Sequence, residues 1–176
     1  MLKIHPSAVA DTRTCNVTKV TKEQLLKASK QHIGDVQKGL RFIANQLLEA
    51  ADRHDHDKVT PEGIELFHKE FTTLDNFGED STWLENHYKV NRHHLETDRG
   101  IRENVDLVDV VEAVVDGVMA GMGRAGRVRD SKISPGVLYT ALNNTVAKLA
   151  AQVEVVPLTE SCEEPRDNTK GLTPGA

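Results

Sequence analysis

Apolar residues recur at steps of three or four along several stretches of the chain, and the longest such stripe covers about residues 22–51. Thr21 and Gln24 precede it with the spacing of a capping box, in which each side chain satisfies the other residue's free backbone N–H. The pattern predicts a long amphipathic helix over residues 22–51, with a bend allowed at Gly34 or Gly39.

Two shorter helices are predicted in the middle of the chain. Thr60 precedes a proline and predicts a helix over about 61–73, because the missing N–H of proline costs nothing in the first turn. Thr82 and Glu85 repeat the capping-box spacing and predict the start of a short helix. Residues 74–81, between these helices, are expected to form a loop.

Two more helices are predicted in the second half of the chain. Residues 105–122 are strongly periodic, and Gly123 and Gly126 are expected to end this helix. Ser134, followed by proline, predicts the start of a last helix that runs to about residue 153.

The fold class follows from these helices, because strand signals are scarce. The sequence predicts an all-α, single-domain helical bundle of about five helices. We expect an irregular arm over residues 1–20 and a helical domain over residues 21–156. The remaining residues, 157–176, are rich in proline, glycine and acidic residues, and they predict a disordered tail.

Composition narrows the class of partner and the compartment. The 22 basic residues are outnumbered by 27 acidic ones, and this argues against a nucleic-acid partner. No apolar run approaches the roughly 20 residues that cross a bilayer, and the N-terminus lacks a signal-peptide pattern. Cys15 and Cys162 form no Cys-x-x-Cys pair. We therefore expect a cytoplasmic protein without a membrane partner; a homo-oligomer stays open.

Histidine is the unusual component of the sequence. Six of the eight histidines lie between residues 54 and 94. A metal ion that activates water needs imidazole and carboxylate ligands and an open position. The candidate ligands are on different predicted helices: His54, Asp55, His87, His94 and Asp116.

Neighbouring residues extend this candidate site. Lys58 stands three residues after Asp55, where its ammonium group could stabilise charge on a phosphoryl oxygen. Only one member of the pair His93-His94 is expected to point inward, and we choose His94. Asp109 and Glu112 share a helix face with Asp116, and a solvated acidic face is the alternative interpretation of these three residues.

The motif His54-Asp55-His56-Asp57-Lys58 resembles the His-Asp-x-x-Lys core of the HD phosphohydrolase superfamily. The residues that follow resemble the branch of that superfamily that hydrolyses cyclic dinucleotides, and they keep its order: His87, His93-His94, Glu96 and Gly100. Asp116-Gly117 resembles the superfamily's closing aspartate. The Gly-Tyr-Pro element of that branch is absent, and Gly100-Ile101-Arg102 stands near its place.

The resemblance implies an HD-domain-like fold and a metal-dependent phosphohydrolase acting on a nucleotide or a related phosphate ester. It implies one or two divalent ions, with an aspartate able to bridge two, and mixed N/O ligands favour Mn, Fe, Co, Ni or Zn. Asp55 and Lys58 would then be catalytic. The superfamily also takes a histidine from an earlier helix, for which His32 is the candidate.

Distance along the chain sets a condition on His32. In one straight helix, 22 residues at about 1.5 Å each would separate His32 from His54 by roughly 33 Å. His32 can therefore be a ligand only if the chain reverses between them. Arg124 and Arg127 belong to a short basic run that could bind substrate phosphate groups, with an exposed loop as the alternative.

A second resemblance covers more of the chain. Residues 22–153 are similar to small bacteriophage and prophage proteins that share the string from His32 to Val36, the HD core and a Trp83-to-His87 step. This resemblance implies a location in the bacterial host cytoplasm but no activity. The alternative function is therefore a non-catalytic, phage-borne helical interaction protein with a structural metal or none. A nucleotide-binding regulator is a third option.

Overall fold

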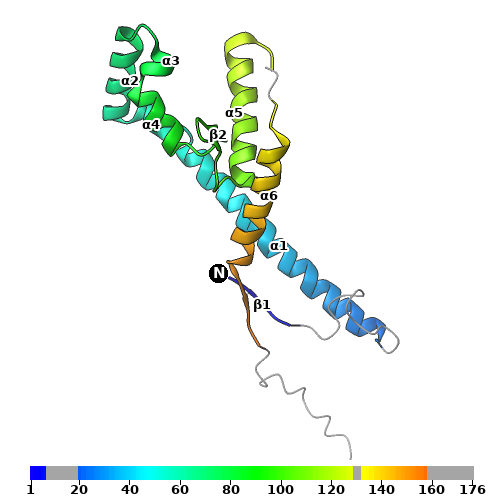
Figure 1. Ribbon diagram of the computed structural model, residues 1–176. Coiled ribbons are helices and arrows are strands. Elements are labelled where there is room, and N and C mark those ends of the chain that lie inside the picture. Colours follow the sequence, from blue (N-terminus) through cyan, green and yellow to red (C-terminus); the bar gives the residue numbers. More distant parts are fainter. Residues whose placement is uncertain (7–19, 129–131, 158–176) are drawn as a thin grey trace, which may run out of the picture. The chain divides into compact units, whose positions relative to one another are not determined.

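The computed structural model describes three ranges of the chain, 1–6, 20–128 and 132–157 (Figure 1). The predicted tail over residues 157–176 lies outside the described residues, except for Pro157. Most of the predicted arm over residues 1–20 lies outside them too, as do Cys15 and Cys162.

The predicted all-α class is confirmed. The helices of the described residues are α1 (Lys22–Arg53), α2 (Pro61–Thr73), α3 (Phe77–Asp80), α4 (Thr82–Val90), α5 (Leu107–Ala125) and α6 (Pro135–Ala150), with the 3-10 turn η2 (His56–Val59). The strands are short: β1 (Leu2–Ile4), β2 (Glu96–Thr97), β3 (Gly100–Ile101) and β4 (Val153–Val155). Two compact units divide the chain, one formed by Met1–Asp35 with Val153 onward, the other by Val36–Gln152.

The first unit contains a small parallel sheet at the two ends of the described chain. Strand β1 pairs with β4 in the register Leu2 to Val153. Gln31 Nε2, on α1, donates to His5 O at 2.6 Å, just after β1. Part of the predicted irregular arm is therefore ordered, and the last helix ends at Ala150 rather than near residue 153. Strands of three residues are too short for a periodic signal.

Local capping explains where α1 and α2 begin. Thr21 N donates to Gln24 Oε1 at 2.9 Å, and Gln24 N donates to Thr21 Oγ1 at 3.2 Å, so the predicted capping box is confirmed. Thr60 Oγ1 accepts from Gly63 N at 3.0 Å and is the N-cap of α2. These partners lie three residues apart, so the sequence alone identifies them.

The predicted capping box of Thr82 and Glu85 is wrong, because Ser81 is the N-cap of α4. Ser81 Oγ accepts from Leu84 N at 2.9 Å. The buried carboxylate of Glu70, on α2, accepts from the Ser81 and Thr82 hydroxyl groups. A long-range partner thus moves the start of the helix by one residue.

An aromatic cluster joins α2, α3 and α4. The rings of Phe67 and Trp83 stack with centroids 4.1 Å apart, and Phe77 packs edge-on against Phe71 at 5.3 Å. Phe77 begins α3, which lies inside the predicted loop over residues 74–81. Packing of this half-buried ring against the other aromatic rings gives the short helix an anchor that its own sequence pattern does not reveal.

Helix α5 begins and ends at residues suited to those positions. Asp106 is its N-cap and forms a capping box with Asp109. Gly126 closes the helix in the left-handed conformation, with φ at 64°. Gly123 lies inside the helix, so the expectation that both glycines end it is corrected.

The hydrophobic core of the second unit lies between α5 and α6, which run side by side in Figure 1. Its buried members are the aliphatic residues Val105, Val110, Val137 and Ala141. Asn144, on α6, donates its side-chain amide to Val105 O at 2.8 Å. The bond ties α6 to the chain that leads into α5, and α5 supplies part of the site described below.

Asp106 links α5 and α6 electrostatically. Its Oδ2 lies 2.8 Å from Lys148 Nζ and 3.3 Å from an Arg92 guanidinium nitrogen. Burial alone would raise the pKa of Asp106, but the hydrogen bond and charge of Lys148, the Val108 N–H and the charge of Arg92 outweigh it and hold the pKa below its ordinary value of 3.8. The ionised form therefore stabilises the fold.

Asp106→Asn should keep the N-cap but lose the charge, because asparagine also caps helices. We expect the variant to be about 1 kcal/mol less stable than wild type at pH 7. Since the folded-state pKa is lowered, this contribution is present above pH 3.8 and is lost as the pH falls through the lower folded-state value. Denaturant unfolding of wild type and variant, at pH 7 and at a pH below the folded-state pKa of Asp106, checks this. A difference in unfolding free energy between the two proteins that stays the same at both pH values would contradict it.

Candidate metal centre

The candidate site begins where α1 ends. Asp55 has a φ of 50° and is the only non-glycine residue with positive φ among the described residues. This left-handed conformation stops α1 and turns the chain into η2, where Lys58 N donates to Asp55 O at 2.9 Å. Such strain in a non-glycine residue concentrates at functional sites. His54 and Asp55 thereby face the residues that follow α4.

Close packing of η2 against α2 positions Asp57. A Cβ atom added to Gly63 would lie 1.8 Å from Asp57 O, so only glycine allows this approach. The Asp57 carboxylate reaches α4, where Oδ2 lies 2.7 Å from His87 Nδ1 and Oδ1 accepts from Asn91 Nδ2 at 2.8 Å. The acidic residue two positions after Asp55 thus orients a histidine of the site.

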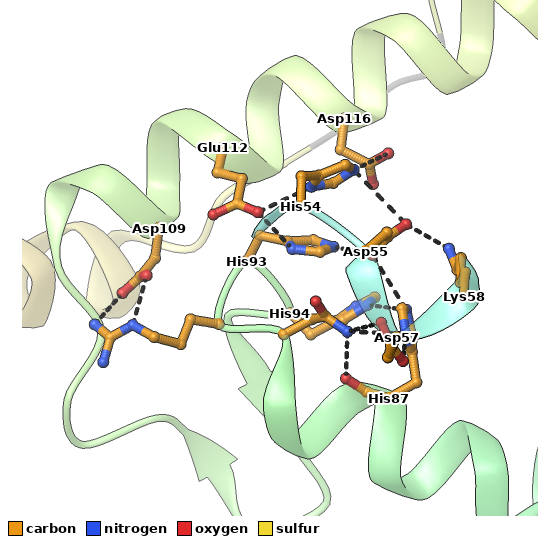
Figure 2. A network of polar contacts seen from close by, with 12 residues as sticks. His54, Asp55, Asp57, Lys58, His87, His93, His94, Asp109, Glu112 and Asp116 are labelled. Carbon is orange, nitrogen blue, oxygen red and sulfur yellow. Dashed lines mark hydrogen bonds and ion pairs between the residues drawn. The ribbon is translucent and has the colours of Figure 1, made fainter. Parts of the chain in front are cut away.

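Figure 2 shows Asp55 at the centre of four imidazoles. Its Oδ1 lies 3.5 Å from both His87 Nε2 and His93 Nε2, is buried, and has no hydrogen-bond partner among the described residues. Its Oδ2 lies 2.5 Å from Lys58 Nζ and 3.6 Å from His54 Nε2. A distance of 3.5 Å is long for a hydrogen bond. It matches the roughly 3.4 Å between two ligands of one tetrahedral ion with bonds of about 2.0–2.1 Å.

Carboxylates at the Nδ1 side of the imidazoles, opposite the Nε2 atoms that face Asp55, orient these rings. Glu112 Oε1, from α5, lies 2.9 Å from His54 Nδ1 and 3.1 Å from His93 Nδ1. The first contact is a hydrogen bond, whereas the second has an ion-pair distance without hydrogen-bond alignment. Carboxylates at Nδ1 place the proton on that nitrogen and leave Nε2 free to coordinate. Asp57 makes the same kind of contact with His87 Nδ1, so three imidazoles of the site have a carboxylate at Nδ1.

The ligand atoms form two groups that share Asp55. One group is His54, Asp55 and His93, the other is Asp55, His87 and His94, and within each group the ligand atoms lie within 4.8 Å of one another. His94 Nε2 lies 3.0 Å from His87 Nε2. Both members of the histidine pair therefore point inward, and the expectation that only one does is wrong. The described residues contain a His/Asp cluster that could hold a metal ion.

The charge state of the cluster suits a cation. Burial would raise the pKa of Asp55, but Lys58, His54 and His87 outweigh it and lower the pKa below 3.8. Burial and the charges of His93 and His87 lower the pKa of His94 to about 4. Burial also lowers the pKa of His93, against the opposing carboxylates. At neutral pH the site thus presents an ionised carboxylate and these two imidazoles in the neutral form that binds metals.

Two arginines hold the turn that carries the histidine pair. Arg102 donates to backbone carbonyl groups on both sides of it, with Nε 2.6 Å from His94 O and Nη2 3.4 Å from Asn91 O. Arg92 binds Asp109 on α5 through two hydrogen bonds of 2.8 and 2.6 Å. This bidentate pair fixes the turn against α5, one helical turn before Glu112.

The acidic residues of α5 do not form a solvated face. Asp109 is 1% exposed and pairs with Arg92, and Glu112 contacts the two imidazoles. Asp116 lies at the edge of the site, with Oδ1 3.8 Å from His54 Nε2, and belongs to neither ligand group. Its side chain is 38% exposed.

The remaining predicted site residues belong to neither ligand group. Helix α1 is continuous from Lys22 to Arg53, so the chain reversal that His32 would need is absent, and neither ligand group includes this residue. Arg124 is exposed in the last turn of α5, and Arg127 is exposed beyond Gly126.

Five residues of the site were not predicted as part of it: His93, Asp57, Asn91, Arg92 and Arg102. His93 had a signal, since it stands beside His94, and Asp57 is an unassigned acid inside the HD core. The sequence indicates Glu112 only as a member of the acidic face that also carries Asp109 and Asp116. The roles of Asn91 and of both arginines depend on contacts that no sequence spacing indicates.

The fold and the site define an all-α protein with a clustered His/Asp site able to hold a metal ion. The chain belongs to DUF5662, a family of unknown function, whose model matches residues 21–152. No curated protein and no solved structure gave a match to the chain. Among the described residues, no helix combines the length and apolar character needed to cross a membrane.

Glu112→Gln should weaken metal binding by about 10–100-fold, because the carboxylate that orients two ligand imidazoles becomes a neutral amide. The fluorescence of Trp83, the one tryptophan, should follow a titration with Mn or Zn, since its ring stacks on His87 with centroids 4.9 Å apart. Glu103→Gln, at an exposed position before α5, is the matched control and should bind like wild type. Equal metal affinities of Glu112→Gln and Glu103→Gln would show that Glu112 does not orient the ligand imidazoles.

Proposed function

We propose that the protein is a metal-dependent phosphohydrolase that acts on a nucleotide or a related phosphate ester. The observation that carries the proposal is the buried Oδ1 of Asp55, which has no hydrogen-bond partner in the part of the chain that the structure describes and lies 3.5 Å from two imidazole Nε2 atoms. A buried carboxylate oxygen without a donor costs free energy unless a cation binds it. The resemblance of His54-Asp55-x-x-Lys58 to the HD superfamily supports this reading.

The residues that would hold an ion fit a first-row transition metal. His54, Asp55 and His93 would hold one ion, His87 and His94 with Asp55 a second, and the mixed N/O set favours Mn, Fe, Co, Ni or Zn. When bound, such an ion supplies the Lewis acidity that activates water and polarises a phosphoryl group. Glu112 and Asp57 would keep the Nε2 atoms directed at the ion.

Residues at the exposed edge of the site would handle the substrate. The side chains of His54 and Lys58 are 32% and 35% exposed, so the site is open there. Lys58 Nζ binds Asp55 Oδ2 and would also neutralise charge that develops on a phosphoryl oxygen. Asp116 would complete the ligand set from α5. Arg124 lies eight residues further along α5, about 12 Å by helical rise, so we assign the phosphate contact to Lys58 rather than to the basic run.

A non-catalytic interaction protein is the second candidate. The observation that favours it is the exposed apolar surface of α5, where Val115 is 54% and Met119 is 66% exposed. Such patches mark interaction surfaces or ligand-binding grooves. In that case a bound metal would raise the melting temperature while no phosphate ester is turned over.

Wild type purified without chelators and supplied with Mn or Co should release phosphate from members of a phosphate-ester panel. His54→Ala and Asp55→Ala should lose both the metal and the activity, because each removes a ligand. The control His68→Ala removes an exposed histidine of α2 outside both ligand groups and should change neither. A wild-type protein that binds no metal and releases no phosphate would overturn the proposed function.

Lys58→Met should separate binding from chemistry. The variant keeps the length and apolar character of the side chain but loses the ammonium group. We expect the bound metal to remain and kcat to fall by about 100-fold, the usual cost of losing one charge-stabilising group. Metal analysis and initial rates measure the two effects. An unchanged kcat would remove Lys58 from the catalytic role.

A further inference from the structure

A cavity of about 420 Å³ lies between α1 and α5. Its apolar lining comes from both helices: Leu47, Ala50, Ala51, Val111, Val115 and Met119. The small side chains on α1 create the space, because two consecutive alanines face the valines of α5. A volume of this size is typical of small-molecule sites.

The cavity is continuous with the candidate metal centre. His54, Glu112 and Asp116 complete its lining, and these are the residues that lie at or support the ligand groups. Figure 2 shows His54 and Asp116 side by side at the edge of the site. A phosphate ester bound at the metal centre would therefore direct its organic group along α1 and α5 into this cavity.

The chemistry of the lining limits that organic group. None of the residues that line the cavity carries a hydroxyl, a carboxamide or a basic aliphatic side chain. The three polar residues lie at the end of the cavity next to the metal centre, where His54 Nδ1 is hydrogen-bonded to Glu112 and Asp116 Oδ1 lies 3.8 Å from His54 Nε2. Selection of a nucleobase depends on hydrogen bonds to its edge, and a cavity whose polar groups all lie at the end next to the metal centre offers mainly apolar contact along the rest of its length.

We propose that the cavity between α1 and α5 binds a linear or branched apolar group, alkyl or aryl, of the phosphate ester. This inference rests on the proposed function and narrows its substrate class from nucleotides to apolar esters. A second copy of the chain is the competing occupant, because the apolar surface of α5 continues to Val114 and Met122 outside the cavity. An apolar surface of a second copy would remove water from His54 and Asp116 without giving them new polar contacts, and this desolvation costs free energy. A phosphate ester avoids this cost, because its phosphate group lies at the end of the cavity where these two residues are.

Binding of straight-chain alcohols tests the cavity without metal or turnover. Butan-1-ol, hexan-1-ol and octan-1-ol are titrated into the full chain and followed by the methyl NMR signals of Val115 and Met119. Affinity should rise by up to about fourfold for each added methylene. Val115→Asn and Met119→Gln should weaken hexan-1-ol binding by about tenfold. The controls Val114→Asn and Met122→Gln, on the same helix but outside the lining, should not.

Phosphate release by the metal-loaded protein tests the substrate class. We expect kcat/KM to rise from butyl to hexyl phosphate and to be lower for nucleoside monophosphates. Alkanol binding without release of phosphate from any ester supports the cavity and overturns the proposed function. Release of phosphate with no dependence on chain length, or with nucleoside monophosphates preferred, overturns the cavity inference alone. Absence of alkanol binding also overturns the cavity inference. If sedimentation then shows a dimer that Val115→Asn dissociates, the occupant of the cavity is a second copy of the chain.

Discussion

The rest of the site depends on the buried carboxylate of Asp55. One of its oxygens is held by Lys58, and the other faces two imidazole nitrogens at a distance too long for hydrogen bonds. Uncompensated, such an oxygen would destabilise the fold. A cation at this point would supply the missing interaction and would link α1, α4 and α5 through His54, His87 and Glu112. Metal binding and the stability of the second unit should therefore be coupled.

Local signals made much of the fold predictable. The caps at Thr21 and Thr60 use partners three residues away, and their helices begin as predicted. The failures have long-range causes. Glu70 determines the start of α4 from eleven residues upstream, and the packing of Phe77 against other rings anchors α3 inside a predicted loop. Strand β1 depends on a partner about 150 residues away along the chain, beyond the reach of any local pattern.

The candidate site was predictable where residue type and order carry the chemistry. His54, Asp55, His87 and His94 follow from residue type and from their order along the predicted helices, and the structure brings them together. Orientation was not predictable. His93 points inward because Arg102 and other contacts shape its turn. In the sequence Glu112 is one of three acids on a helix face, and only its tertiary contacts show that it orients two imidazoles. Spacing suggests which side chains can meet, whereas tertiary packing decides which atoms face each other.

The most direct test is anomalous X-ray diffraction from crystals of the full chain purified without chelators. The account predicts a peak within bonding distance of Asp55 Oδ1 and of the Nε2 atoms of neighbouring imidazoles, and at full loading a second peak sharing Asp55. Crystals soaked with Mn or Zn that show no peak there, with an ordered donor such as a lysine or a water molecule bound to Oδ1 instead, would contradict it.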